Sequence, residues 1–88
     1  MAQANYKFKM GSATCELITG YEFTTTGQEE VTHTMGVIPD LVLITNKAAY
    51  SVYKSADSTA SVVKLTGGNA DAACDILLIH DSAKIKTA

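Results

Sequence analysis

The sequence contains no Trp and no Arg, and only one Pro and two Cys among its 88 residues. Its seven basic residues are all Lys. Arg makes the bidentate contacts by which proteins recognise phosphate and guanine, so its absence argues against a nucleic-acid partner. The net charge of -2 argues in the same direction, because DNA-binding domains normally present a basic surface.

Long hydrophobic runs are also missing. The longest, 41–44 and 76–79, are far below the roughly 18–20 residues that a membrane-spanning helix needs. The first residues lack a basic segment followed by an apolar one, so we expect no signal peptide and synthesis in a cytoplasm. An apolar content of 47% is ordinary for a globular protein and argues against disorder. A chain of this size buries only about 60–65% of its unfolded surface, which leaves a thin margin of stability.

Hydrophobic alternation with a period of two runs through the chain. Tyr6, Phe8 and Met10 fall on one face of a segment whose other face carries Lys7 and Lys9, which predicts a half-buried strand. Residues 13–26 read as one bent strand or two short ones, because the isolated Gly20 indicates a bulge or bend. Residues 41–45 are apolar almost throughout, which predicts a strand buried on both faces.

Further strands are expected over 29–34, 50–55, 59–65 and 75–80, and no segment shows a sustained helical period. The predicted fold class is all-β, a small antiparallel β-sandwich or partly closed barrel of about six to eight short strands. We expect a single β domain over residues 1–88, with terminal arms at 1–5 and 81–88.

The residue types of a nucleophilic triad are present: Cys15 or Cys74, His33 or His80, and Asp40, Asp75 or Asp81. No nucleophile elbow or cysteine-protease signature accompanies them, so we expect no catalysis, although a hydrolase built on these residues remains one hypothesis. The ligand spacing of a zinc site and the phosphate-binding loop are both absent, and no metal or cofactor is predicted. The two cysteines are interpreted as small core residues or as one cross-link.

Two stretches resemble a known group of proteins. Residues 31–44, VTHTMGVIPDLVLI, and residues 74–80, CDILLIH, are similar to segments of small β-sandwich virion proteins of tailed bacteriophages. That group includes capsid decoration proteins, head fibres and tail-fibre tips. The resemblance implies that His33, Gly36 and Pro39 form a structural corner between two strands and carry no chemistry.

The resemblance implies a capsid decoration protein on the virion surface, made in the host cytoplasm. It would bind the outer surface of the major capsid lattice and associate with itself, for example as a trimer. Its contact elements would be the chain ends, unless these are simply frayed. The predicted contact residues are Met1, Ala2, Gln3, Ala4, Asn5, Lys84, Ile85 and Lys86. The alternative is a fibre tip or lectin-like module that binds host glycans near Tyr50 and Tyr53.

Overall fold

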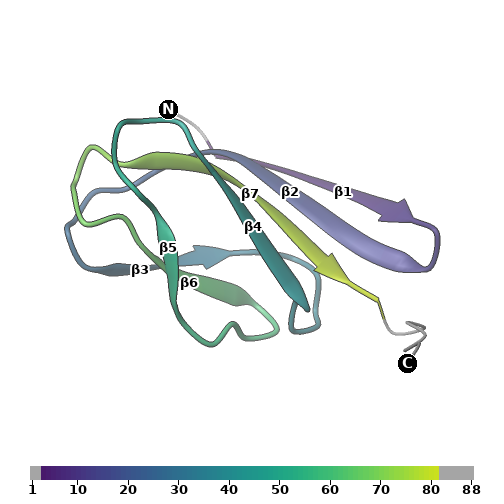
Figure 1. Ribbon diagram of the computed structural model, residues 1–88. Coiled ribbons are helices and arrows are strands. Elements are labelled where there is room, and N and C mark those ends of the chain that lie inside the picture. The colour runs from purple at the N-terminus through teal and green to yellow at the C-terminus, as the bar shows by residue number, and fades with distance from the viewer. Residues whose placement is uncertain (1–2, 82–88) are drawn as a thin grey trace, which may run out of the picture.

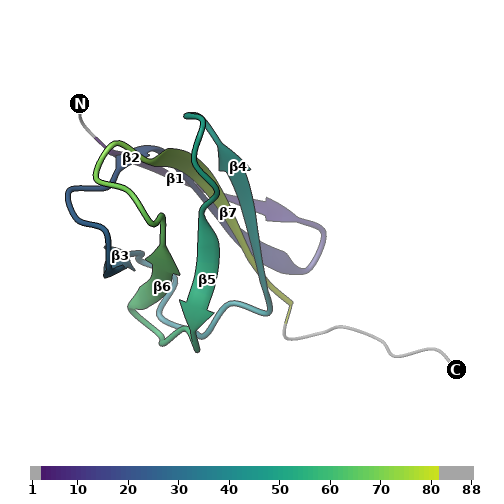
Figure 2. The same cartoon turned by 60° about the vertical axis from the view of Figure 1, so that its left-hand side comes forward.

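The computed structural model describes residues 3–81, which fold into two antiparallel sheets packed as layers (Figures 1 and 2). The described residues form no helix, so the predicted all-β sandwich is confirmed. The four-stranded sheet A has the order β1 (Ala4–Met10), β2 (Ala13–Glu22), β7 (Ala73–His80) and β4 (Leu41–Asn46). The three-stranded sheet B has the order β3 (Gln28–Thr32), β6 (Val62–Thr66) and β5 (Tyr53–Ala56).

Two glycines shape the hairpin at the start of sheet A. Gly11 has a φ of 61° at the first position of the two-residue turn between β1 and β2, where a type II′ turn needs positive φ. Gly20 has a φ of 71°, and the register between β2 and β7 shifts between Ile18 and Tyr21. The Gly20 N–H donates to Asp75 Oδ1 at 3.0 Å. The bulge predicted at Gly20 is therefore confirmed.

The core lies between the facing sides of the two sheets. Ile18, Ile76 and Leu78 of sheet A are fully buried against Val63 and Leu65 of sheet B. These residues follow the alternation of their strands, so each strand directs every second side chain into the core. Phe23, Val31, Val52, Ala72 and Cys74 complete the buried cluster.

The sequence interpretation was wrong about two strands of sheet A. Tyr6 and Met10 of β1 were expected to be half-buried, but 55% and 52% of their surfaces are exposed. Residues 41–45 were expected to be buried on both faces, but β4 is an edge strand, and Leu41 and Leu43 are 52% and 49% exposed. The physical reason is that sheet B covers one face of sheet A, and within residues 3–81 no second layer lies on the other face (Figure 1).

The predicted N-terminal arm is also shorter than expected. Strand β1 begins at Ala4, which pairs with Thr19, and Asn5 pairs with Ile18. Gln3 precedes the strand and donates from its side chain to Asn5 Oδ1 at 2.8 Å. The remaining predicted contact residues, Met1, Ala2, Lys84, Ile85 and Lys86, lie outside the described residues.

A buried carboxylate joins the two sheets. Glu16 of β2 is fully buried and accepts a hydrogen bond from Asn5 Nδ2 at 2.6 Å. It also accepts bonds from the Thr34 N–H at 2.9 Å and from Thr34 Oγ1 at 2.8 Å, just after β3. Burial alone would raise the pKa of Glu16, but the hydrogen bonds from Asn5 and Thr34 outweigh it and hold the pKa below the ordinary value. The charged form is therefore built into the fold.

Replacing Gly67 by Ala should destabilise the protein. A Cβ at this position would lie 2.7 Å from Ala72 Cβ and 3.3 Å from the Phe23 ring, and neither neighbour is a flexible chain end. We expect Gly67→Ala to lower the free energy of unfolding by about 1–3 kcal/mol in urea titrations. Gly27→Ala is the control, because nothing lies within 4 Å of its Cβ. Equal effects of the two substitutions would contradict the packing described.

The buried Glu16 should make stability depend on acid. Its pKa in the folded state lies below 4.5, so its contribution is present above pH 4.5 and is lost as the pH falls through the folded value. At pH 7 we expect Glu16→Gln to lower the free energy of unfolding by about 1–3 kcal/mol, which lowers the melting temperature. Between pH 7 and pH 3 the melting temperature of this variant should fall less than that of the parent protein. The exposed Glu30 supplies the control, Glu30→Gln, which should keep the acid dependence. A Glu16→Gln profile parallel to the parent protein would count against this role.

Candidate functional site

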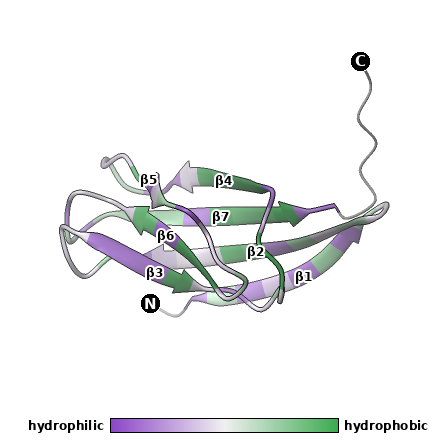
Figure 3. Cartoon of the chain, turned by 90° about the horizontal axis from the view of Figure 1, so that it is seen from below, coloured by the Kyte–Doolittle hydropathy of each residue, from purple (hydrophilic) through white to green (hydrophobic). Residues whose placement is uncertain are grey.

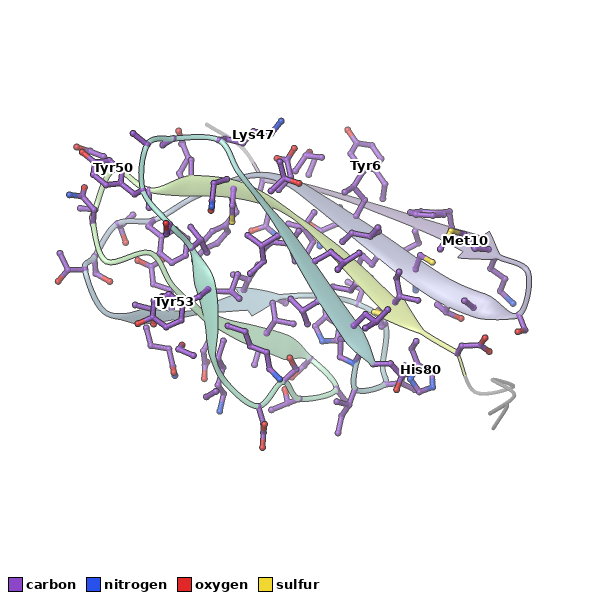
Figure 4. The ribbon with its side chains drawn as sticks, in the orientation of Figure 1. Tyr6, Met10, Lys47, Tyr50, Tyr53 and His80 are labelled. Carbon is purple, nitrogen blue, oxygen red and sulfur yellow. The ribbon has the colours of Figure 1, made fainter. Side chains whose placement is uncertain are left out.

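The side of sheet A that faces away from sheet B is apolar across all four strands. The residues that face one another across the strands there form two continuous rows. One row is Tyr6, Leu17, Leu77 and Leu43, and the other is Phe8, Cys15, Ile79 and Leu41. We call these eight residues the outer apolar face. In Figure 4, Tyr6 stands on the side of sheet A away from β3, β5 and β6.

In the β1–β2 hairpin, the apolar and the basic side chains of β1 lie on opposite sides of the sheet. Phe8 and Met10 lie on the outer side of β1, whereas Lys7 and Lys9 lie on the inner side. Lys9 is exposed there, and Lys7 Nζ reaches Thr34 O at 3.2 Å. An antiparallel sheet with one solvated face normally puts its polar residues on that face. In this hairpin the apolar side chains take the outward positions instead.

Charge is almost absent from this side of the sheet. Its acidic residues in β2 and β7 are Glu22, which pairs with Ala73, and Asp75, both at the end where β4 finishes, and Lys47 Nζ lies 3.2 Å from Asp75 Oδ2. The hydrogen bond from the Gly20 N–H, together with Lys47, holds the pKa of Asp75 below its usual value. Asp75 is thus an ion-paired carboxylate beside the outer apolar face, and the eight residues of that face carry no charge.

The size of the face can be set against known surfaces. Two rows about 6.6 Å apart, across four strands about 4.8 Å apart, give these eight residues a flat footprint of about 250 Å². Tyr6, Phe8, Leu41 and Leu43 are between 41% and 55% exposed, so the surface is open to a partner. The largest apolar patch on a typical monomer is about 300–600 Å² and is often functional, so the outer apolar face approaches that range.

Of the candidate catalytic residues, the structure brings His80 and Asp40 within 3.6 Å of each other, but it separates the two cysteines. Cys15 and Cys74 are both free and buried, and they lie on opposite sides of sheet A, Cys15 in the outer row and Cys74 in the core. Burial, with the nearby Asp75 charge, raises the pKa of Cys74 to about 11, so its thiol stays protonated near neutral pH. Within residues 3–81 no group of three or more His, Cys, Asp or Glu side chains could hold a metal ion.

The three predicted corner residues lie in the connection between β3 and β4. His33 is buried, its Nε2 lies 3.0 Å from Thr59 O, and its Nδ1 accepts a bond from the Met35 N–H at 3.2 Å. Gly36 has a φ of 73°, and Pro39 is buried just before β4. The second histidine, His80, ends β7, with Nδ1 3.0 Å from Ile38 O and 3.6 Å from Asp40 Oδ2.

The two tyrosines of the glycan alternative lie at the opposite end of the molecule from Met10 (Figure 4). Tyr50 is 38% exposed in the loop before β5, and Tyr53 is 56% exposed at the start of β5. The ring contact among the described residues is that of Tyr21 with Phe23, edge to face at 5.1 Å between centroids. Tyr50 and Tyr53 are thus both exposed and make no ring contact with each other.

A small open hollow of about 280 Å³ lies beside the loop after β2. Its lining residues are Glu22, Phe23, Thr24, Ala70, Asp71 and Ala72. The loop is braced by Glu29, whose Oε2 accepts bonds from the Thr24 and Thr25 N–H groups at 2.9 Å, and whose Oε1 accepts one from Tyr21 Oη at 2.7 Å. Burial and the bond to Glu29 raise the pKa of Tyr21. Glu29 and Tyr21 thus satisfy each other beside the hollow, whose own lining carries the carboxyl groups of Glu22 and Asp71.

Sequence reasoning missed the outer apolar face, although part of its signal was visible. Alternation separated Tyr6, Phe8 and Met10 from the lysines, but alternation alone does not say which side faces the core. The decisive information is the cross-strand register, which aligns Leu17 with Tyr6 and with Leu77.

Comparisons with models of protein families, with curated proteins and with solved structures find no match to this chain. Among residues 3–81, no helix is long and apolar enough to cross a membrane. The outer apolar face is therefore the feature of the described residues that bears most directly on function.

The buried thiols give a direct check on this arrangement. We expect Cys15 and Cys74 to react with a chromogenic disulfide reagent at pH 8 only after unfolding in guanidinium chloride, because both side chains are fully buried. Two equivalents should then react, and Cys15→Ala should leave one. Rapid reaction of either thiol in the native protein would contradict the packing of Cys15 beneath its neighbours or of Cys74 in the core.

Proposed function

We propose that this chain is a structural virion protein, a capsid decoration protein that binds the outer surface of the major capsid lattice and stabilises it. It binds through the outer apolar face, performs no catalysis and requires no cofactor. The observation that carries the proposal is the polarity of the β1–β2 hairpin, where Phe8 and Met10 point outward while Lys9 lies on the inner side.

The chemistry of the face defines the partner surface. Eight side chains without charge fit an apolar, uncharged patch on a folded protein, because an ionic or strongly hydrated partner would lose hydration without compensation. Nucleic acid does not fit, since none of the eight residues is basic. The partner in this proposal is the major capsid protein, which the resemblance of residues 31–44 and 74–80 suggests.

A lattice suits a face of this size. A footprint of about 250 Å² is about a third of the roughly 800 Å² that each partner contributes to a standard protein–protein interface. One isolated contact of this size is weak, but a repeating surface keeps the local concentration of sites high. Binding to the folded form also stabilises a small domain by mass action. In this proposal the outer apolar face is the main contact element, and Ala4 and Asn5, two of the predicted contact residues, are part of β1.

Binding to capsids should depend on Tyr6. We expect the purified protein to sediment with expanded, undecorated capsids assembled from the major capsid protein encoded nearest to it. Tyr6→Lys should weaken this binding about tenfold or more, because it puts a charge into the apolar contact where a buried tyrosine typically contributes strongly. The measurement is the fraction of protein in the pellet across a concentration series at low and moderate salt.

Tyr53→Lys is the matched control, since Tyr53 is 56% exposed against 55% for Tyr6 but lies in sheet B. It should bind within about twofold of the parent protein, as surface changes outside a contact usually do. Absence of binding by the parent protein would refute the proposal, and equal losses in both variants would refute the use of the outer apolar face. Loss with Tyr53→Lys alone would favour the tyrosine end of the molecule as the binding site.

A further inference from the structure

The four edge strands of the two sheets are not protected equally. An open edge can pair with another chain, and proteins commonly block this with charged side chains, bulges or Pro. Strand β1 carries Lys7 and Lys9, β3 carries Glu29 and Glu30, and β5 carries Lys54 next to a register shift. Strand β4, with the sequence LVLITN, carries no charge and no bulge. Figure 3 shows the contrast, with β4 largely hydrophobic and β3 largely hydrophilic.

The backbone of β4 has hydrogen-bonding groups directed outward. The Lys47 N–H donates to Ala73 O at 2.8 Å, which makes 47 and 73 a hydrogen-bonded pair in the antiparallel ladder. Such pairs alternate along the strands, so Leu41, Leu43 and Thr45 direct their N–H and C=O groups toward β7. Val42 and Ile44 then direct theirs away from β7, to the side where the described part of sheet A has no further strand.

We infer that β4 pairs antiparallel with β4 of a second copy of this chain, which joins two copies of sheet A into one continuous sheet about a two-fold axis. The axis passes beside Leu43, so that Leu43 of one copy lies opposite Leu43 of the other. Val42 of each copy then faces Ile44 of the other, and their outward N–H and C=O groups form hydrogen-bonded pairs. This register keeps the inner residues of both copies on one face and Leu41 and Leu43 on the other.

A second copy fits this edge better than an unrelated strand for two reasons. The edge carries no charge, so two identical edges meet without repulsion, and a two-fold contact is the commonest closed symmetry. Pairing also makes the two outer apolar faces continuous. Their joint footprint of about 500 Å² comes closer than one copy does to the roughly 800 Å² that each partner contributes to a standard interface.

Disulfide trapping tests the pair and its register without any capsid present. Opposed residues of a non-hydrogen-bonded pair have Cα atoms about 4.5 Å apart, within the range that a disulfide spans. We expect Leu43→Cys to form a covalent dimer under mild oxidation, seen on a non-reducing gel. Leu41→Cys is the matched control on the same strand and face, where the two copies of the residue would be about 13 Å apart. It should cross-link at least tenfold more slowly. The native cysteines are buried and do not compete.

Sedimentation equilibrium at up to about 1 mM protein gives the second readout, because even a weak pair is partly formed at that concentration. The mass should rise from 9.3 kDa toward twice that value, and Tyr6→Lys should behave in the same way. Leu43→Lys should remain at the monomer mass, since it places like charges opposite each other. Val42→Pro should also remain a monomer, since it removes an N–H that points away from β7.

A monomeric parent protein, equal trapping at positions 41 and 43, or a dimer that survives both Leu43→Lys and Val42→Pro would overturn the inference. Dimer formation without capsid binding would refute only the proposed function.

Discussion

Sheet A has apolar side chains on both faces, and sheet B covers only one of them. This imbalance is the constraint on which the rest of the molecule depends. On the covered face, Ile18, Ile76 and Leu78 make the core with sheet B. On the open face, the rows that run from Tyr6 and Phe8 across to β4 have no layer above them within the described residues. A small chain cannot supply that layer from its own strands, so the proposed partner supplies it.

Much of the fold could be predicted because its signals are local. Strand alternation, turn glycines and the break at Gly20 all act within a few residues, and they predicted an all-β sandwich with a bulge in the second strand. The exposure of β4 could not be predicted in the same way. A continuous apolar run is typical of a central strand, and only the order β1-β2-β7-β4 places it at an edge. The same limit applies to Tyr6, whose direction depends on where sheet B packs.

The hydrogen-bond partners of Glu16 could not be predicted from the sequence either. Its alternation places it among core residues, and its hydrogen-bond partners come from β1 and from the segment after β3. The carboxylate thereby connects the hairpin of sheet A to the crossing between the sheets, next to the buried His33. A buried charge is tolerable here because several donors satisfy it. It fixes the position of the β3–β4 connection, which leads the chain into the exposed edge strand.

The uneven protection of the edges limits how far this protein can assemble. A chain with two uncharged edges could add copies at both sides and grow into a fibre, as open head-to-tail contacts do. The strands of residues 3–81 include one such edge, in β4, while β1, β3 and β5 each carry charged side chains. In the inferred dimer each β4 strand occupies the uncharged edge of the other, so growth would stop at the pair. Charge placement on three short strands would thus set the valence of the molecule.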